Sequence, residues 1–205
     1  MEFAIDIIFS FLMIAVMVVI ATSLIFESKT DIAPVPTLPW VEKKMIDALK
    51  RRFKSDREYK VAELGSGWGT LAFAFAKTFP NVKVTGYEIS PFPFWFSEFR
   101  NKIQSKQKQI TFHRDSFFDH DLSDFNVVIF YLSPRHTEKL QEKLERELKP
   151  GTIVMSNAFP MPDWRPKTVL KTKVFVEIPI YVYVTPARIE EAGGDQGIAD
   201  EQEQA

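Results

Sequence analysis

Residues 60–69, Lys-Val-Ala-Glu-Leu-Gly-Ser-Gly-Trp-Gly, decide the fold of this chain. The apolar run through Glu63 predicts a buried strand, the three glycines at alternate positions predict a tight turn, and residues 70–79 predict a helix. A turn of this kind brings backbone N–H groups and a helix N-terminus against a ligand, which suits an anionic group.

A second acid follows the next predicted strand. Residues 82–87 are largely apolar and lead directly into Glu88. In nucleotide-binding α/β folds an acid at this position accepts the hydroxyls of a ribose. The glycine turn and Glu88 together therefore predict a site for a nucleoside-containing cofactor.

Length and composition favour one folded domain. The chain has 205 residues, a net charge of −1 and a pI near 6.3, so nothing indicates a nucleic-acid partner. It has no cysteine, which excludes disulfides, thiolate metal sites and cysteine nucleophiles. His113, His120 and His136 lack the spacing of metal ligands, and we expect solvated or capping roles for them. No metal site is predicted.

The N-terminus predicts a membrane anchor. Residues 7–26 are 20 residues without a charge, enough at about 1.5 Å per residue to cross a hydrocarbon core of about 30 Å. Acids but no basic residues precede this run, unlike a cleaved signal peptide or a mitochondrial presequence. Lysines and arginines follow it, so the positive-inside rule places the remainder in the cytoplasm. We expect residues 1–28 to form a single-pass anchor in a prokaryotic inner membrane.

Three further parts follow the anchor. Residues 29–40 contain Ala-Pro-Val-Pro-Thr-Leu-Pro, which predicts a stiff, extended juxtamembrane linker. Residues 41–186 are long enough for one core and form the predicted folded domain. Residues 187–205 are polar and acidic, which predicts a disordered tail.

Within the folded domain, apolar periodicity alternates between helix and strand. Helices are predicted at 41–53, 68–79, 91–105 and 136–148, and strands at 60–64, 82–88, 110–113, 126–131, 152–156, 168–176 and 180–185. This alternation predicts an α/β fold with a mostly parallel sheet and ligands at the carboxyl ends of its strands. The last two strands predict an antiparallel hairpin with Pro179 by the turn.

The spacing of the glycines distinguishes between cofactors. Nicotinamide and flavin sites usually read G-x-G-x-x-G, whereas this chain reads G-x-G-x-G with an acid two residues before the first glycine. With the C-terminal hairpin, this pattern resembles the Rossmann-like class I S-adenosylmethionine-dependent methyltransferases. The resemblance implies S-adenosylmethionine as cofactor, with Glu63 near its amino group, Glu88 on the ribose and Asp115 on the adenine amino group. The cofactor-binding residues that it implies are Glu63, Gly65, Ser66, Gly67, Trp68, Gly69, Glu88, Ile89, Asp115 and Ser116.

A narrower resemblance extends over most of the chain. The anchor, Pro34-Val35-Pro36-Thr37, Tyr87-Glu88-Ile89-Ser90-Pro91-Phe92 and Phe159-Pro160-Met161-Pro162-Asp163-Trp164 look like the FAM173-type protein-lysine methyltransferases. Eukaryotic members of that group modify lysines of inner mitochondrial membrane proteins. The resemblance implies a lysine of a membrane or membrane-associated protein as the methyl acceptor. The chain departs from the group in Tyr131-Leu132-Ser133-Pro134 and in its tail.

A lysine acceptor needs an apolar pocket, because such a pocket favours the neutral amine, and aromatic rings also hold a methylated cation. Tyr131, Phe159 and Trp164 are candidates for its walls, and Ser133 and Pro134 follow the strand that carries Tyr131. Ordinary packing is the alternative for the three rings, and helix capping is the alternative for Ser-Pro. The aromatic-rich helix after Pro91 is expected to pack under the sheet, or against the anchor and the bilayer surface.

Two other functions stay open. One is methyl transfer to a lipid-like or quinone acceptor, which the anchor would keep near the membrane. The other is a nucleoside-cofactor-binding oxidoreductase or a non-catalytic binding module. Ser133-Pro134-Arg135 is a poor match to the Asp/Asn-Pro-Pro-aromatic motif of adenine-N methyltransferases, and the nearly neutral charge argues against a duplex substrate.

Overall fold

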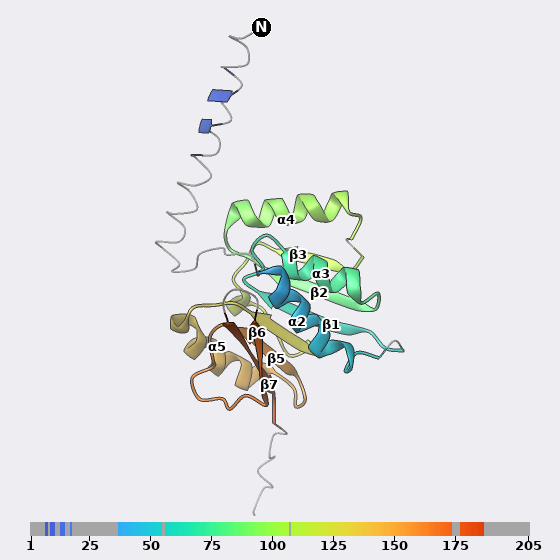
Figure 1. Ribbon diagram of the computed structural model, residues 1–205, viewed down its shortest axis with the longest axis vertical. Helices are drawn as coiled ribbons and strands as arrows, with labels where there is room; N and C mark the ends of the chain where they lie inside the picture. Colours follow the sequence, from blue (N-terminus) through green and yellow to red (C-terminus); the bar gives the residue numbers. More distant parts are fainter. Residues whose placement is uncertain are drawn as a thin grey trace, which may run out of the picture.

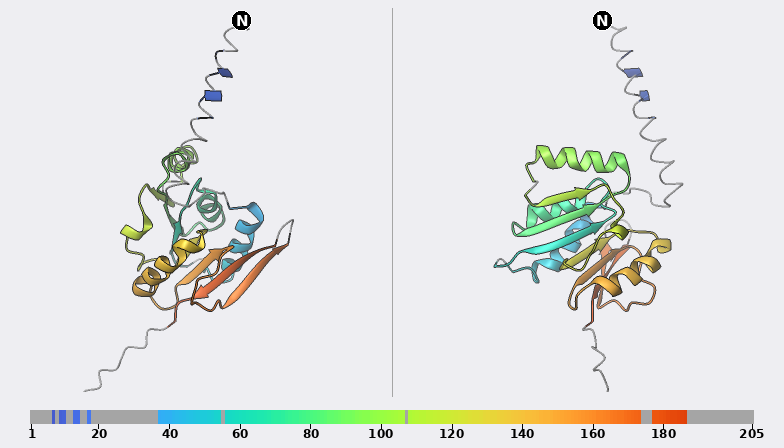
Figure 2. Two further views of the ribbon diagram at one scale, coloured as in Figure 1. Left: turned by 90° about the vertical axis from the view of Figure 1, so that its left-hand side faces the viewer. Right: turned by 180° about the vertical axis from the view of Figure 1, so that it is seen from behind.

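A seven-stranded sheet crosses the structure, and helices pack against both of its faces (Figures 1 and 2). The computed structural model describes residues 7, 9–10, 13–14, 17, 37–54, 56–106, 108–173 and 177–186. Its elements are α2 (Pro39–Lys50), β1 (Tyr59–Leu64), α3 (Thr70–Thr78), β2 (Val82–Tyr87), α4 (Pro91–Ile103), β3 (Ile110–His113), η1 (Phe117–Asp119), β4 (Val127–Phe130), α5 (Pro134–Glu147), β5 (Ile153–Asn157), β6 (Thr168–Lys173) and β7 (Glu177–Val184).

The strands follow the order β3-β2-β1-β4-β5-β7-β6. The first five strands pair in parallel, whereas β7 lies antiparallel between β5 and β6. The order reverses between β1 and β4, which makes their carboxyl ends the topological switch point where ligands of α/β folds bind. The predicted α/β sheet with an antiparallel C-terminal hairpin is confirmed.

The sheet buries an apolar core on each face. Val61 and Ile129 point into the core under α2 and α3, and Phe130 and Tyr183 point into the core under α5, where Leu144 meets them. Successive residues of one strand point to opposite faces, so strands buried on both sides must be apolar throughout. This requirement explains why the strands could be recognised as short apolar runs.

The predicted elements are present with ends shifted by up to three residues. One detail was wrong, because Pro179 lies inside β7 opposite Lys171 rather than by the turn. Its carbonyl accepts the N–H of Ala158 at 2.9 Å, just beyond the last residue of β5. In an antiparallel sheet the N–H and C=O of one residue point to the same neighbouring strand, which for Pro179 is the side of β5. Because β5 ends at Asn157, the missing N–H of Pro179 costs no hydrogen bond between the two strands.

The predicted anchor, residues 7–26, lies almost entirely outside the described residues, as do most of the linker and the whole tail at 187–205. Within the part of the chain that the structure describes, no helix has both the length and the apolar character needed to span a bilayer.

Close packing around Phe112 fixes the turn after β1 against β2 and β3. A Cβ built on Gly86 would lie 2.6 Å from Cδ1 of Phe112 and 2.8 Å from the Ser66 hydroxyl oxygen. A Cβ on Gly69 would lie 2.7 Å from the same phenyl ring. Both positions therefore require glycine so that the phenyl ring can fill the space beneath the turn.

We expect Gly86→Ala to lower the free energy of unfolding by about 1–3 kcal/mol, because the added methyl group overpacks this space. Urea denaturation measures the change. In a Phe112→Ala background the same substitution should cost less, because Cδ1 and Cε1 of the phenyl ring, which the methyl group meets first, are gone. An equal cost in both backgrounds would contradict this explanation.

Candidate active site

The turn between β1 and α3 follows backbone conformations that favour glycine. Gly65, Gly67 and Gly69 have φ values of +72°, +51° and +71°, all in the left-handed region. The N–H groups of Gly65 and Ser66 both donate to the carbonyl of Tyr87 at 2.9 Å, which joins the turn to the end of β2. Nothing lies within 4 Å of the position of a Cβ on Gly67. The turn therefore presents bare backbone to a ligand.

Glu88 holds this turn in place from the end of β2. It is 6% exposed, one carboxylate oxygen accepts the N–H of Gly67 at 2.7 Å, and the other accepts the N–H of Ser90 at 2.7 Å. A carboxylate has about four lone-pair positions, so Glu88 can accept two ribose hydroxyls while it keeps both backbone bonds.

Glu63 caps α3 from the end of β1. Gly69, the N-cap residue, has no side chain to satisfy the helix, and the Glu63 carboxylate accepts the N–H of Ala72 at 3.1 Å instead. Burial raises the pKa of Glu63 well above the usual range, and the negative charges of Glu42 and Glu88 raise it further. A buried carboxyl near two other acids is ionised readily only when a cation approaches.

Glu42, on α2, is the third acid near the turn, and sequence reasoning missed it. Burial raises its pKa, while a hydrogen bond with Thr70 and the positive charge of Arg100 act in the opposite direction. Glu42 stood in the sequence as one charge of an amphipathic helix, so only the packing of α2 against α3 reveals its position. Three carboxyl groups around one glycine turn favour a cationic ligand and oppose a diphosphate.

The loop after β3 brings Asp115 and Ser116 to the same edge of the sheet. The Asp115 side chain is 59% exposed and lies 3.5 Å from Nε2 of His120. The Ser116 hydroxyl accepts the N–H of Phe118 at 3.3 Å and so begins η1. His120, for which a solvated or capping role was expected, lies between Asp115 and the ring of Tyr87, whose centroid is 4.8 Å from that of His120.

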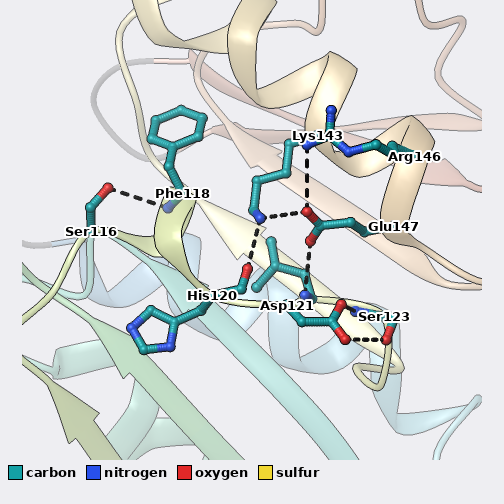
Figure 3. Close-up of polar contacts among 9 residues, drawn as sticks. Ser116, Phe118, His120, Asp121, Ser123, Lys143, Arg146 and Glu147 are labelled. Carbon is teal, nitrogen blue, oxygen red and sulfur yellow. Dashed lines mark hydrogen bonds and ion pairs between the residues drawn. The ribbon is translucent and has the colours of Figure 1, made fainter.

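Helix α5 clamps this loop through a buried ion pair (Figure 3). Lys143 is 5% exposed, and its ammonium group donates to the carbonyl of His120 at 2.7 Å and to Glu147 at 2.6 Å. The second carboxylate oxygen of Glu147 accepts the N–H of Leu122 at 2.9 Å. The chain just beyond Asp115 is therefore held by two backbone contacts from one ion pair.

Tyr131 and Phe159 stack on each other near the ends of β4 and β5. Their rings stack at 22° with centroids 6.3 Å apart. Ser133 occupies the N-cap position of α5 and Pro134 the first helical position, as the capping interpretation predicts. The Ser133 hydroxyl makes no capping hydrogen bond, however, and lies 3.0 Å from Nδ1 of His136 instead.

Asn157, at the end of β5, is a second residue that the sequence prediction missed. It is 3% exposed, and its side-chain carbonyl oxygen has no hydrogen-bond partner among the described residues. The register pairs Phe130 with Ser156, so the next residues, Tyr131 and Asn157, leave neighbouring strands at the same level. The available signal was a polar residue at the carboxyl end of a predicted strand.

Trp164 packs against the core under α5. Its indole N–H donates to Glu145 at 2.6 Å and its ring packs on Tyr183 at 5.7 Å, beside a groove of about 490 Å³ that Leu144 and Leu148 also line. Among the described residues, neither a hydrogen bond nor a ring contact joins it to Tyr131 or Phe159. An indole needs both an apolar surface and a partner for its N–H, and the core under α5 supplies both. The position of Trp164 therefore agrees with ordinary packing of its ring, the alternative to a place in the acceptor pocket.

The other predicted cofactor residues gather at one edge of the sheet. Trp68 lies in the glycine turn, and Ile89 is half-buried directly after Glu88. The reversed strand order, the antiparallel β7 and the acid–glycine–acid arrangement at the carboxyl ends define a class I S-adenosylmethionine-dependent methyltransferase.

The chain belongs to the family described as the ANTKMT methyltransferase domain, whose family model matches residues 63–168. It is 32% identical over 146 residues to a protein-lysine N-methyltransferase of Saccharolobus islandicus, covering 68% of this chain and 88% of that one. It is 30% identical over 114 residues to the adenine nucleotide translocase lysine N-methyltransferase of Mus musculus, covering 56% of this chain and 49% of the relative. This chain thus spans about half the length of the mouse protein.

A solved structure shares both fold and sequence features with the chain. The RNA methyltransferase of Salinibacter ruber, in complex with S-adenosyl-L-homocysteine, matches with a TM-score of 0.66 and 28% identity over 77% of this chain and 97% of that chain. The cofactor of this enzyme family is S-adenosylmethionine, and the residues present fit it. The bare backbone at Gly67, the remaining lone pairs of Glu88 and the ring of acids suit a nucleoside that carries a sulfonium and an ammonium group.

We expect Lys143→Met to destabilise the protein by about 2–4 kcal/mol, because the buried His120 carbonyl loses its donor and Glu147 keeps the more distant Arg146, at 3.7 Å. Lys149→Met is the matched control, since Lys149 pairs with Asp124 on the surface and its loss should change stability little. Urea denaturation compares the two variants. Equal effects would contradict a structural role for the buried pair.

The raised pKa of Glu63 predicts a pH dependence of stability. The folded state binds this proton more tightly than the unfolded chain, so the contribution is full below the usual pKa of Glu and is lost as the pH rises towards the raised value. Without cofactor, Glu63→Gln should therefore lose less stability than the parent between about pH 5 and pH 8.

Urea titrations of both proteins across this pH range measure how the free energy of unfolding changes with pH. Parallel profiles for the two proteins would contradict the expected difference.

The same variant should bind S-adenosylmethionine about 10- to 100-fold more weakly, because a neutral amide replaces a charged partner.

Proposed function

We propose that this protein is a membrane-tethered S-adenosylmethionine-dependent N-methyltransferase that acts on a lysine of a membrane or membrane-associated protein. Two relatives are named as lysine N-methyltransferases, and the name of one gives a translocase as its substrate. The uncharged run at residues 7–26 supports the tether, and the basic residues that follow it support a cytoplasmic position for the domain, on the inner face of a prokaryotic membrane.

The observation that carries this proposal is the shared edge of the sheet. Glu63 lies near the end of β1 and Glu88 follows β2, on either side of the glycine turn. Tyr131 follows β4, and Asn157 is the last residue of β5. S-adenosylmethionine supplies an electrophilic methyl group on its sulfonium. Residues that bind this cofactor and residues that bind an acceptor must meet at one edge for an in-line displacement, which depends mainly on positioning.

The acceptor end suits an amine. At pH 7 less than about 0.1% of a solvated lysine is neutral, and an apolar environment raises this fraction by disfavouring the ammonium form. Tyr131 and Phe159 supply apolar faces, and the unpartnered carbonyl of Asn157 is placed to accept an N–H of the amine. The same aromatic faces favour a methylated, still cationic product.

Methyl-tritium labelling of membranes tests the proposal. The full-length protein is added with labelled S-adenosylmethionine to membranes from cells that lack it, and we expect the label in a protein band whose acid hydrolysate contains methyllysine. Glu88→Ala should abolish most of the labelling, because it removes the ribose acceptor and releases the Gly67 and Ser90 N–H groups. Glu142→Ala, at an exposed acid of α5, is the matched control and should label normally.

Label in the lipid extract instead of protein would favour the lipid-like or quinone acceptor. Equal labelling by the Glu88→Ala and Glu142→Ala variants would overturn the site. Binding of a nicotinamide dinucleotide in place of S-adenosylmethionine would indicate an oxidoreductase.

A further inference from the structure

Helix α4 exposes an apolar stripe on the side that faces away from the sheet. Four large apolar side chains of this helix are between 48% and 66% exposed: Trp95, Phe96, Phe99 and Ile103. At about 100° per residue they fall within an arc of about 100°. The buried residues Pro93, Ser97 and Asn101 lie on the opposite side of the helix.

This arrangement reverses the usual one for a surface helix. A surface helix normally turns its apolar stripe towards the core and its charges outward. Here α4 lies on the outside of the described domain (Figure 1). Its fully buried residues are small or polar, and the half-buried Phe94 packs against the core beside them. A contiguous exposed apolar patch of this kind marks a surface that binds something.

Positive charges border the stripe. Lys102 flanks one long edge of the stripe, and Glu98 is the single acid of α4. Arg100 lies beyond the other edge, where its guanidinium group stacks on the ring of Phe73 at 4.1 Å. Arg114, from the loop after β3, places its guanidinium group 5.4 Å from the ring of Trp95. Aromatic and aliphatic side chains bordered by basic residues are typical of helices that lie in the plane of an anionic lipid surface.

We propose that the exposed face of α4 docks on an anionic lipid bilayer. The inference rests on the proposed membrane tether. Residues 27–36 separate the uncharged run from the first described residue of the domain, and these ten residues reach at most about 35 Å. A linker of this length lets any face of the domain contact the membrane. Among these faces, the exposed side of α4 has the apolar and basic residues that suit lipid.

The stripe is small for a protein partner. A stable dimer usually buries about 800 Å² on each protomer with a closely packed centre, whereas this surface consists of four side chains on one helix. Lipid docking needs no such complementary surface. Because Phe96 packs edge to face against Trp68 of the glycine turn at 5.4 Å, the docked face adjoins the cofactor turn. Docking would therefore orient the active edge relative to acceptors in the same membrane.

Single labels can test the docking directly, because the chain has no cysteine of its own. Phe99→Cys and Ile103→Cys carry an environment-sensitive fluorophore on the stripe, and Glu142→Cys carries it on exposed α5 as the matched control. The full-length variants are mixed with vesicles of phosphatidylcholine and phosphatidylglycerol. We expect a blue shift at positions 99 and 103, weaker with pure phosphatidylcholine or high salt, and none at position 142.

Flotation of the same samples separates this inference from the tether. Chains that float with vesicles while labels 99 and 103 stay in an aqueous environment would overturn the docking and leave the tether standing. Chains that do not float would overturn both, although methyl transfer to lysine would still be tested by the labelling of membranes. A blue shift that depends on protein concentration without lipid would assign the face to a second copy and overturn the proposal.

Discussion

The active edge depends on two hydrogen bonds to one buried carboxylate. Glu88 receives the N–H of Gly67 and the N–H of Ser90, each at 2.7 Å, so it joins the glycine turn to the start of α4. Gly67 has a positive φ, and its N–H would otherwise be buried without an acceptor, at a cost of about 1–3 kcal/mol. The carboxylate is thus fixed in direction before a ligand binds, which reduces the ordering that binding would require.

The same edge concentrates acidic side chains that the fold does not need for its stability. Glu42 and Glu63 both have raised pKa values because burial disfavours their charged forms, and Glu88 adds a third acid. Such an arrangement is unfavourable without a ligand, and unfavourable local choices are expected at functional sites. A cofactor that carries a positive charge favours the ionised forms of these acids, whereas the diphosphate of a dinucleotide would disfavour them. Charge therefore supports the same choice of cofactor as the spacing of the glycines.

Sequence reasoning was reliable where one local pattern decides the outcome. Buried strands need apolar runs, and the left-handed turn needs glycine, so β1, the turn and Glu88 could be predicted from neighbouring residues. It could not foresee contacts between distant segments. Glu42 reaches the site because α2 packs beside α3, and Trp164 contacts Glu145 because the chain after β5 returns over α5. No local pattern encodes either contact.

The two outward helices show that exposure alone does not explain α4. Both α4 and α5 start with Ser-Pro after a parallel strand, and both turn one side to solvent. On α5 that side is charged, and its one buried cation, Lys143, secures the loop beyond Asp115. On α4 that side is aromatic and aliphatic. In both helices the side that faces solvent would normally carry charged residues, and only α5 follows this rule. The apolar side of α4 is therefore not required for folding, and it reflects a contact outside the domain.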